Sequence, residues 1–307
     1  MNYLVTGGAG FIGSHLVARL LKEDCDVLLI VDDLSEGALI NLPKDPRIKF
    51  FKASILDNKI SKCFKDIDVV FHLAALTRPQ WSMIHPEETC RTNVEGTIRI
   101  FNNCVKHKVK RVVFVSSSSL YGDQLVFPTP ETAPANPLSP YGLTKYEGEL
   151  WAELYKNLYN LQVNSIRPFN VYGSRQNPNS PYSAAAPKFL NELKRGETPW
   201  ITGDGEQARD FIYVDDVVEI IYRASKCKEY GEAFNAGSGT NISINKLYDL
   251  VCRIMGKYVK PDYVAPVVEP NMTLGDMSKV KRILNFEPKI GLEEGLRRTI
   301  DEDSSIR

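Results

Sequence analysis

A tyrosine and a lysine with the spacing of a catalytic pair, Tyr141 and Lys145, stand at the start of a helical pattern. Residues i and i+4 of a helix share one face, so the phenol and the ammonium are expected one turn apart. A cation there favours the phenolate and is expected to lower the tyrosine pKa from ~10, as a base for hydroxyl groups requires. The spacing alone is common, and a solvated lysine beside a core tyrosine is the alternative. The Tyr141/Lys145 pair follows the strand expected at 111–116, and this position favours a catalytic role.

A run of four serines, 116–119, follows the same expected strand. Hydroxyl groups at the carboxyl end of a parallel strand can hydrogen-bond a reacting oxygen. Small polar residues also simply let a chain turn, and composition does not choose among the four serines.

Three glycines, Gly7, Gly10 and Gly13, separate an apolar run from an apolar-periodic helix. A side chain at these points would block a tight turn, the approach of the backbone to a pyrophosphate, or the packing of helix on strand. A second expected strand ends in Asp32, whose carboxylate can accept both adenosine-ribose hydroxyls and would repel a 2′-phosphate. The pattern therefore favours a NAD site over a NADP site, and a glycine turn without a ligand is the alternative.

Alternating strands and helices must position these residues. Strands are expected at 3–6, 27–31, 48–52, 68–72, 111–116 and 162–167, and helices at 11–23, 86–107, 141–159, 214–226, 243–256 and 276–284. Runs that are apolar on both faces are typical of a parallel sheet covered by helices. The fold class is therefore α/β, with a doubly wound parallel-sheet Rossmann domain and a small C-terminal α/β substrate lobe. We expect residues 1–170 in the cofactor domain, with about 205–240 returning to it, and 171–307 mainly in the lobe.

The composition is that of an ordinary globular protein. The chain has 307 residues, 43% hydrophobic, with 38 basic and 38 acidic side chains. This balance gives no global field to attract nucleic acid or an anionic membrane, and no apolar run nears the ~20 residues of a membrane span. The six cysteines are scattered without histidine partners, which predicts reduced thiols in the cytoplasm and no metal site.

Longer segments occur in a fixed order along the chain. They are GGAGFIG from Gly7, VDDLS from Val31, HLAA from His72, NVEGT from Asn93, SSSSLYG from Ser116, RPFNVYG from Arg167 and GDGEQARDFIYVDD from Gly203. With Tyr141 and Lys145, this set resembles the extended short-chain dehydrogenase/reductases, within the group of NAD-dependent nucleotide-sugar epimerases and dehydratases. The resemblance covers essentially the whole length and is specific for the family rather than for the substrate.

The resemblance implies the roles of the site residues. The family's catalytic serine lies four residues before the Tyr-Gly pair, which selects Ser117; Tyr141 would be the base, and Lys145 would hold the phenolate and the nicotinamide ribose. The implied NAD-binding residues are Gly7, Gly10, Phe11, Ile12, Gly13, Asp32, Asp33, Leu34, Ser35, Gly37, Ser54, Ile55, Leu73, Ala74, Ala75, Asn93, Tyr141, Lys145 and Phe169.

The resemblance also implies contacts to a nucleotide-diphosphate sugar. The implied substrate residues are Ser117, Asn170, Lys188, Arg209, Glu269 and Thr273. Arginine bonds phosphate oxygens in a bidentate fork, although Arg209 could instead pair with Asp210 or Asp215. Trp200 is expected either near the nucleotide or as a filler of the core.

Several positions depart from the family pattern. The usual Asp-Ile that bonds adenine is Ser54-Ile55, so that contact is weaker or comes from Asp57, and the second diphosphate arginine is replaced by Pro266. Thr273 stands where a bulky tyrosine excludes 2-acetamido sugars in relatives, so N-acetylated hexoses are admitted. Relatives that act on uronic acids carry Thr at position 170 and Arg at 177, where this chain has Asn170 and Asn177.

The two residues after Ser117 sort the family's reactions. Dehydratases carry Asp-Glu there and decarboxylases a glutamate at the second position, whereas this chain has Ser118 and Ser119, which cannot do carboxylate acid–base work. The resemblance therefore implies an isomerase with tightly bound NAD that inverts C4 of a nucleotide hexose (UDP-Glc/UDP-Gal or UDP-GlcNAc/UDP-GalNAc) through a 4-keto sugar. A nucleotide-sugar reductase or dehydratase, or a non-catalytic NAD-binding scaffold, is the alternative.

Family members usually form homodimers through a four-helix bundle. The corresponding helices here are those expected at 86–107 and 141–159, and the second carries an apolar stripe over residues 150–158. Part of that stripe must face the sheet, so the pattern permits a dimer without requiring one.

Overall fold

The computed structural model describes residues 1–176 and 185–305, and a seven-stranded sheet forms its centre. The strands are β1 (Asn2–Thr6), β2 (Val27–Asp32), β3 (Ile48–Lys52), β4 (Val69–His72), β5 (Arg111–Val115), β6 (Gln162–Pro168) and β11 (Ala233–Ala236). All neighbours pair in parallel, in the order β11-β6-β5-β4-β1-β2-β3. The expected doubly wound parallel sheet is confirmed, with β11 as a seventh strand beyond the six expected.

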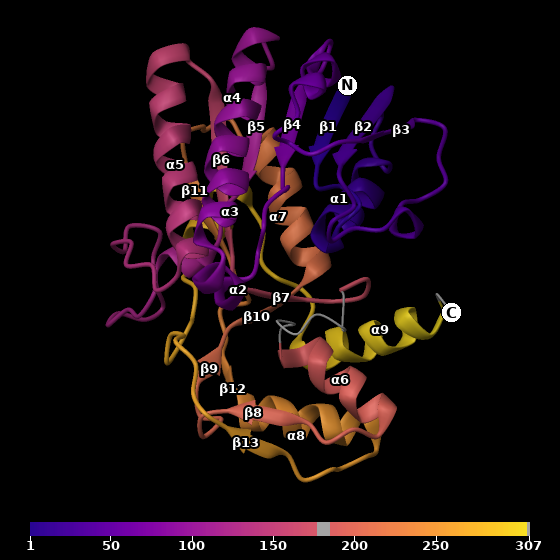
Figure 1. Cartoon of the computed structure of the whole chain (residues 1–307), viewed down its shortest axis with the longest axis vertical. Helices are drawn as coiled ribbons and strands as arrows, with labels where there is room; N and C mark the ends of the chain where they lie inside the picture. Colours follow the sequence, from indigo (N-terminus) through magenta and orange to yellow (C-terminus); the bar gives the residue numbers. More distant parts are fainter. Residues whose placement is uncertain (177–184, 306–307) are drawn as a thin grey trace.

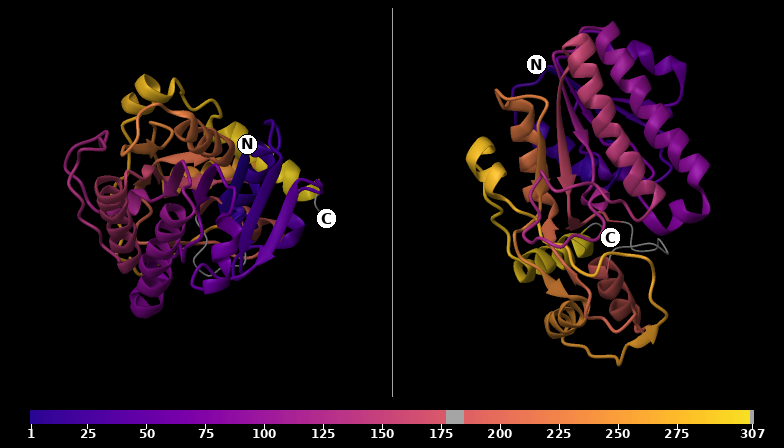
Figure 2. Two further views of the ribbon diagram at one scale, coloured as in Figure 1. Left: turned by 90° about the horizontal axis from the view of Figure 1, so that it is seen from above. Right: turned by 90° about the vertical axis from the view of Figure 1, so that its left-hand side faces the viewer.

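Alternate residues of each strand enter one of two apolar cores on opposite faces of the sheet. Tyr3 and Val5 pack with α1 (Phe11–Leu20) and α7 (Val214–Lys226), while Leu4 packs with α4 (Gly96–Lys106) and α5 (Pro140–Tyr159). This alternation follows from the two-residue period of a strand. Figures 1 and 2 show the helix pairs on either side of the sheet.

The helix carrying Tyr141 starts where the sequence predicts. The Ser139 hydroxyl accepts a hydrogen bond from the amide of Gly142, and Pro140 occupies the first turn, where its missing N–H costs nothing. The expected helix at 86–107 is divided into α3 (Pro86–Cys90), a π-helical turn (Arg91–Glu95) and α4. The helix expected at 276–284 forms over 278–284, and its last five residues, Val280–Leu284, are π-helical.

Smaller elements lie beyond one end of the sheet, in the lower part of Figure 1. Short strand pairs are β7 (Asn170–Tyr172) with β10 (Phe211–Tyr213), β9 (Ala208–Arg209) with β12 (Ile242–Ser243), and β8 (Trp200–Thr202) with β13 (Asp262–Val264). The helices there are α6 (Ala185–Arg195), α8 (Ile244–Met255) and α9 (Leu292–Ser305), and a short helix α2 (Pro79–Ile84) follows β4. The division into two domains at residue 170 remains a prediction.

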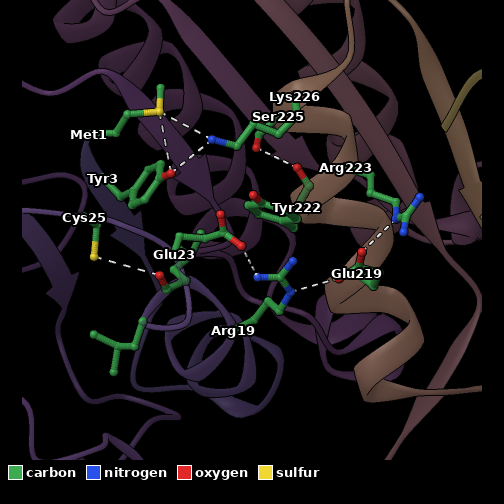
Figure 3. Close-up of polar contacts among 12 residues, drawn as sticks. Met1, Tyr3, Arg19, Glu23, Cys25, Glu219, Tyr222, Arg223, Ser225 and Lys226 are labelled. Atoms are coloured by element: carbon green, nitrogen blue, oxygen red, sulfur yellow. Dashed lines mark hydrogen bonds and ion pairs between the residues drawn. The ribbon is translucent and has the colours of Figure 1, made fainter.

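A polar cluster joins α1 to α7 (Figure 3). The Arg19 guanidinium donates to Glu23 (2.6 Å) and Glu219 (2.9 Å) and lies 3.9 Å from the centroid of the Tyr222 ring. Lys226 donates to the Tyr3 hydroxyl at 3.2 Å. The cluster fixes α1, whose first turn carries the glycine loop, against its neighbouring helix.

No helix within the described ranges is long and apolar enough to cross a membrane.

Candidate active site

The site residues gather at the carboxyl edge of the sheet, where the strand order changes direction. From β1 the chain proceeds to β2 and β3 on one side, and to β4, β5 and β6 on the other. The loops after β1 and β4 therefore diverge, and such a switch point is where open α/β sheets bind ligands.

The glycine loop leaves no space for a side chain at Gly7 or Gly13. A Cβ on Gly13 would lie 2.0 Å from the Gly7 carbonyl oxygen, and one on Gly7 would lie 2.8 Å from the amide nitrogen of Ala74. Gly7 also has a φ of 72°, which suits glycine. At Gly10 the nearest atom to a Cβ is 3.3 Å away, so its requirement is weaker.

The first turn of α1 is free to bind an anion. Gly10 caps the helix without a side-chain hydrogen bond, and no acidic residue stands in the first turn. The amides of Phe11, Ile12 and Gly13 therefore have no partner within the helix, and the helix dipole favours negative charge at this point. These features fit the pyrophosphate of a dinucleotide.

Asp32 lies buried beside this turn. Its two carboxylate oxygens accept the amides of Ala9 (2.9 Å) and Leu34 (2.8 Å). Burial raises the Asp32 pKa, and the two amide bonds offset part of that rise. Each oxygen keeps a lone pair for a ribose hydroxyl. The next three predicted residues, Asp33, Leu34 and Ser35, form a turn in which Asp33 accepts hydrogen bonds from the amide and the hydroxyl of Ser35.

A buried hydrogen-bonded chain shapes the loop after β4. The Thr97 hydroxyl donates to the Asn93 carbonyl, so His72 Nε2–H must donate to Thr97 Oγ1 (2.9 Å). His72 Nδ1 then accepts from Thr6 (2.8 Å), whose oxygen accepts the Ala74 amide. Burial lowers the His72 pKa to about 3, so the ring is neutral.

Asn93 supports the predicted cofactor wall through its side-chain amide. It pairs with both the N–H and the C=O of Leu76 (2.8 and 2.9 Å) and donates to Thr144 Oγ1 (3.0 Å) on α5. Asn93 thus links the segment containing Leu73, Ala74 and Ala75 to the helix that carries Tyr141.

The residues expected near adenine have other partners. Ser54 Oγ accepts the Leu56 amide, Ile55 is buried against Gly96, and the Asp57 carboxylate pairs with Lys59. The structure therefore gives no reason to choose Asp57 over Ser54 as the residue that replaces the family's adenine-binding aspartate.

Tyr141, Ser117 and Lys145 come together as the sequence predicts. The Ser117 side chain lies close enough to the Tyr141 phenol to lower its pKa, and Lys145 Nζ lies 5.9 Å from the centroid of the Tyr141 ring. Lys145 donates to the Val115 carbonyl at 2.8 Å, at the end of β5.

The predicted lowering of the Tyr141 pKa is wrong for these residues on their own. Burial raises the Tyr141 pKa, and the bond from Ser117 lowers it only in part. Burial also lowers the pKa of Lys145 to about 7, against a smaller opposite effect of Glu149. The sequence indicated a nearby cation but not the desolvation of both groups.

A buried ion pair behind this trio was missed at the sequence level. Arg167, of the RPFNVYG segment, donates to Glu149 (2.6 Å) on α5 and to the Tyr121 hydroxyl (2.7 Å). Glu149 stands four residues after Lys145, so the spacing Tyr141–Lys145–Glu149 was the signal available. The pair joins α5 to β6 and to the serine loop.

A cavity of about 320 Å³ opens beside the serine loop. Ser119 lines it and accepts a hydrogen bond from the Ser117 hydroxyl at 3.0 Å. Five of the six predicted substrate residues also line it: Asn170, Lys188, Arg209, Glu269 and Thr273. The chain thus brings together residues from 79 to 273 around one space, and Gln80 and Gln207 are lining residues not foreseen.

Lys188 lies against an aromatic wall of this cavity. Its ammonium donates to the Trp200 carbonyl (2.7 Å), lies 2.8 Å from the centroid of the Trp200 ring and is 4.0 Å from Glu192. Burial lowers the Lys188 pKa to about 8. Trp200 is 39% exposed, so it is not a filler of the core.

Arg209 pairs with another predicted substrate residue. Its guanidinium lies 2.8 Å from the Glu269 carboxylate and donates to two backbone carbonyls. Neither Asp210 nor Asp215 is its partner; Asp210 instead accepts the amides of Ser238, Gly239 and Gly275. Asn170 and Thr273 are within hydrogen-bonding distance at 3.4 Å. Asn177 lies outside the described residues.

Phe169 is buried at the junction of these parts. It packs on Tyr121, with a 6.3 Å distance between ring centroids, and against Gly275. No cluster of His, Cys, Asp or Glu able to hold a metal ion exists within residues 1–176 and 185–305.

Comparisons with known proteins agree with this geometry. The model of the NAD dependent epimerase/dehydratase family matches residues 3–237. UDP-glucose 4-epimerase of Mycolicibacterium smegmatis is 36% identical over 308 residues, covering 98% of each chain. Among solved structures, UDP-glucose 4-epimerase of Thermotoga maritima with UDP-glucose superposes with a TM-score of 0.95 at 37% identity and 99% coverage of both chains. UDP-N-acetylglucosamine 4-epimerase of Methanobrevibacter ruminantium, in complex with UDP-N-acetylmuramic acid, also gives 0.95, at 34% identity over 100% of this chain and 99% of that one.

Proposed function

The chain belongs to the NAD-dependent epimerase/dehydratase family, and from this premise we propose that it inverts C4 of a UDP-hexose with NAD as a resident cofactor. The residues at the switch point fit the dinucleotide. The first turn of α1 would hold its pyrophosphate and Asp32 its adenosine ribose. When bound, NAD would supply the hydride acceptor and donor that inversion of C4 through a 4-keto sugar requires.

The chain itself supplies the acid–base chemistry. Tyr141 takes the proton of the sugar 4-hydroxyl and later gives one back, while Ser117 hydrogen-bonds the reacting oxygen. Lys145, held by the Val115 carbonyl, lies beside the phenol, and its lowered pKa of about 7 means that it is fully charged only below neutral pH. The Ser117 side chain opposes part of the rise in the Tyr141 pKa that burial causes. A protonated Lys145 would act in the same direction.

The observation that favours epimerisation over dehydration is the composition of the cavity wall beside Ser117. Ser118 and Ser119 form that wall, and hydroxyls cannot act as the carboxylate acid and base of a dehydratase. Thr273 on the opposite side is small, which supports acceptance of N-acetylated hexoses as well.

A product screen tests this function. Purified protein is incubated with UDP-glucose, UDP-galactose, UDP-GlcNAc and UDP-GalNAc, and the sugars are followed by proton NMR without added cofactor. We expect C4 inversion of at least one pair and bound NAD in the protein. A 4-keto-6-deoxy sugar would instead identify a dehydratase, and no reaction of any sugar despite bound NAD would support a scaffold.

The affinity for a UDP-sugar is expected to fall as the pH rises from 7 to 9. Lys188 faces the same cavity as Arg209, and its lowered pKa of about 8 means that it loses its positive charge within this range. A neutral amine attracts the diphosphate less. Calorimetric titration with UDP across this range measures the effect.

The Lys188→Met variant is the control for that titration. It should bind UDP weakly at every pH and lose the decline between pH 7 and 9. A decline of the same size in this variant would show that another group titrates.

We also propose a homodimer through α4 and α5. Exposed apolar side chains follow one side of α5, with Leu150, Leu154 and Leu158 exposed to 47%, 41% and 62%. An unpartnered apolar stripe at this spacing suits helix packing. Leu154→Arg is expected to give a monomer in analytical ultracentrifugation at micromolar concentration. Leu125→Arg, at a 99% exposed loop residue, should leave the dimer intact, and equal behaviour of the two variants would contradict this interface.

The proposal extends to the division of labour along the chain and to the compartment. Cofactor binding by residues 1–170 with about 205–240, and substrate binding mainly by residues 171–307, agree with the lining of the cavity. Six free cysteines, five of them buried, support a reducing compartment such as the cytoplasm.

A further inference from the structure

An ion pair between Glu36 and Arg78 joins the two segments that flank the glycine loop, and the roles assigned above do not use it. Glu36 belongs to the loop after β2, and Arg78 is the residue directly before α2 in the segment after β4. The Arg78 guanidinium donates a hydrogen bond to the Glu36 carboxylate. The side chains are 40% and 25% exposed, so the pair lies at the rim of the protein rather than in its core.

The strand order shows that this ion pair spans the end of β1. β1 lies between β2 and β4 in the sheet, with β2 hydrogen-bonded on one side and β4 on the other. A side-chain bridge from the loop after β2 to the segment after β4 therefore crosses the carboxyl end of β1. This end of β1 continues into the glycine loop.

Both ends of the bridge are attached to that loop. On the β2 side, a Cβ on Gly37 would lie 2.7 Å from the Ala9 carbonyl carbon, and the Ala38 amide donates to the Ala9 oxygen at 3.1 Å. On the β4 side, Ala74 is packed directly against Gly7. Glu36 and Arg78 thus connect the two segments on either side of the glycine loop, each held to that loop by close backbone contact.

We propose that Glu36 and Arg78 form a clasp that closes over the bound dinucleotide and slows its release. This inference rests on the proposed function, because an epimerase restores its NAD in each cycle and works best if it keeps the cofactor. The clasp requires both charges. A direct contact of Arg78 with the pyrophosphate would require only the arginine, so the two explanations differ in the effect expected at Glu36.

Release of NADH from the reconstituted protein tests the clasp. The protein is loaded with NADH, chased with excess NAD⁺, and followed by the loss of bound NADH fluorescence. Glu36→Gln and Arg78→Gln are each expected to release NADH about two- to fivefold faster, the range for an exposed ion pair. The double variant should be no faster than the faster single one, because both changes remove the same interaction.

Two controls complete the experiment. Glu293→Gln breaks an exposed pair with Arg297 on α9, far along the chain from the crevice, and should leave the release rate unchanged. At about 1 M salt, screening should bring the wild-type rate close to that of the variants.

The outcomes separate the clasp from the proposed function. If both single variants release NADH at the wild-type rate, the clasp is overturned. It is also overturned if only Arg78→Gln releases NADH faster, since that result would assign Arg78 to the phosphates. A wild-type protein that binds no dinucleotide at all would refute the proposed function itself, before any variant is compared.

Discussion

Tyr141→Phe is expected to lower kcat for C4 epimerisation about 10²–10⁴-fold, the contribution typical of a positioned acid–base group. The substitution removes one oxygen from a buried ring and leaves the ring's packing in place. The Ser117 hydroxyl keeps its hydrogen bond to Ser119, and no other phenol takes the place next to Lys145 among the described residues. The measurement is the rate of interconversion of the UDP-sugar pair that the screen identifies.

Tyr159→Phe is the matched control for this loss. Tyr159 is the last residue of the same helix, at the opposite end from Tyr141, and its side chain is 54% exposed. Its variant should turn over at the wild-type rate. A Tyr141→Phe protein that did the same, with NAD still bound, would remove Tyr141 from the chemistry.

Gly13→Ala is expected to weaken NAD binding about tenfold or more and to lower the melting temperature. The new methyl group would lie 2.0 Å from the Gly7 carbonyl oxygen and 2.8 Å from the Gly8 Cα, and backbone atoms at these distances must move. Overpacking of this kind costs about 1–3 kcal/mol, and 1.4 kcal/mol corresponds to a tenfold change in affinity. Fluorescence titration with NADH and thermal unfolding measure the two effects.

Gly10→Ala provides the comparison within the same loop. A Cβ there meets its nearest neighbour at 3.3 Å, and Gly10 has a φ of −74°, which any residue adopts. We expect a smaller loss of NADH affinity than for Gly13→Ala. Equal losses in the two variants would show that the spacing inferred for the loop is incorrect.

The sequence predicted those parts of the fold that depend on short-range patterns. Valine- and isoleucine-rich runs such as Val112 and Val113 marked buried parallel strands, and the Tyr141/Lys145 spacing placed both side chains on one helical face. The strand β11, Ala-Phe-Asn-Ala, carries neither alternation nor β-branched residues, so only its pairing with β6 reveals it. Helix α6 lay hidden in a proline-containing segment, because Pro187 occupies the first turn, where proline is tolerated.

Long-range effects escaped the sequence. Arg209 pairs with Glu269, 60 residues further along the chain, rather than with the neighbouring aspartates that local reasoning offered. The direction of the Tyr141 pKa was missed because sequence spacing shows a nearby charge but not how much water burial removes. Electrostatics in this site therefore depends on packing that only the folded chain reveals.

The most direct test of the central claim follows a label at C4. UDP-glucose carrying deuterium at C4 is incubated with the purified protein in ordinary water, and both sugars are examined by NMR and mass spectrometry. We expect the C4 epimer to retain its deuterium, because the hydrogen that leaves C4 returns to C4. Epimer in which C4 carries hydrogen from the solvent would contradict the account.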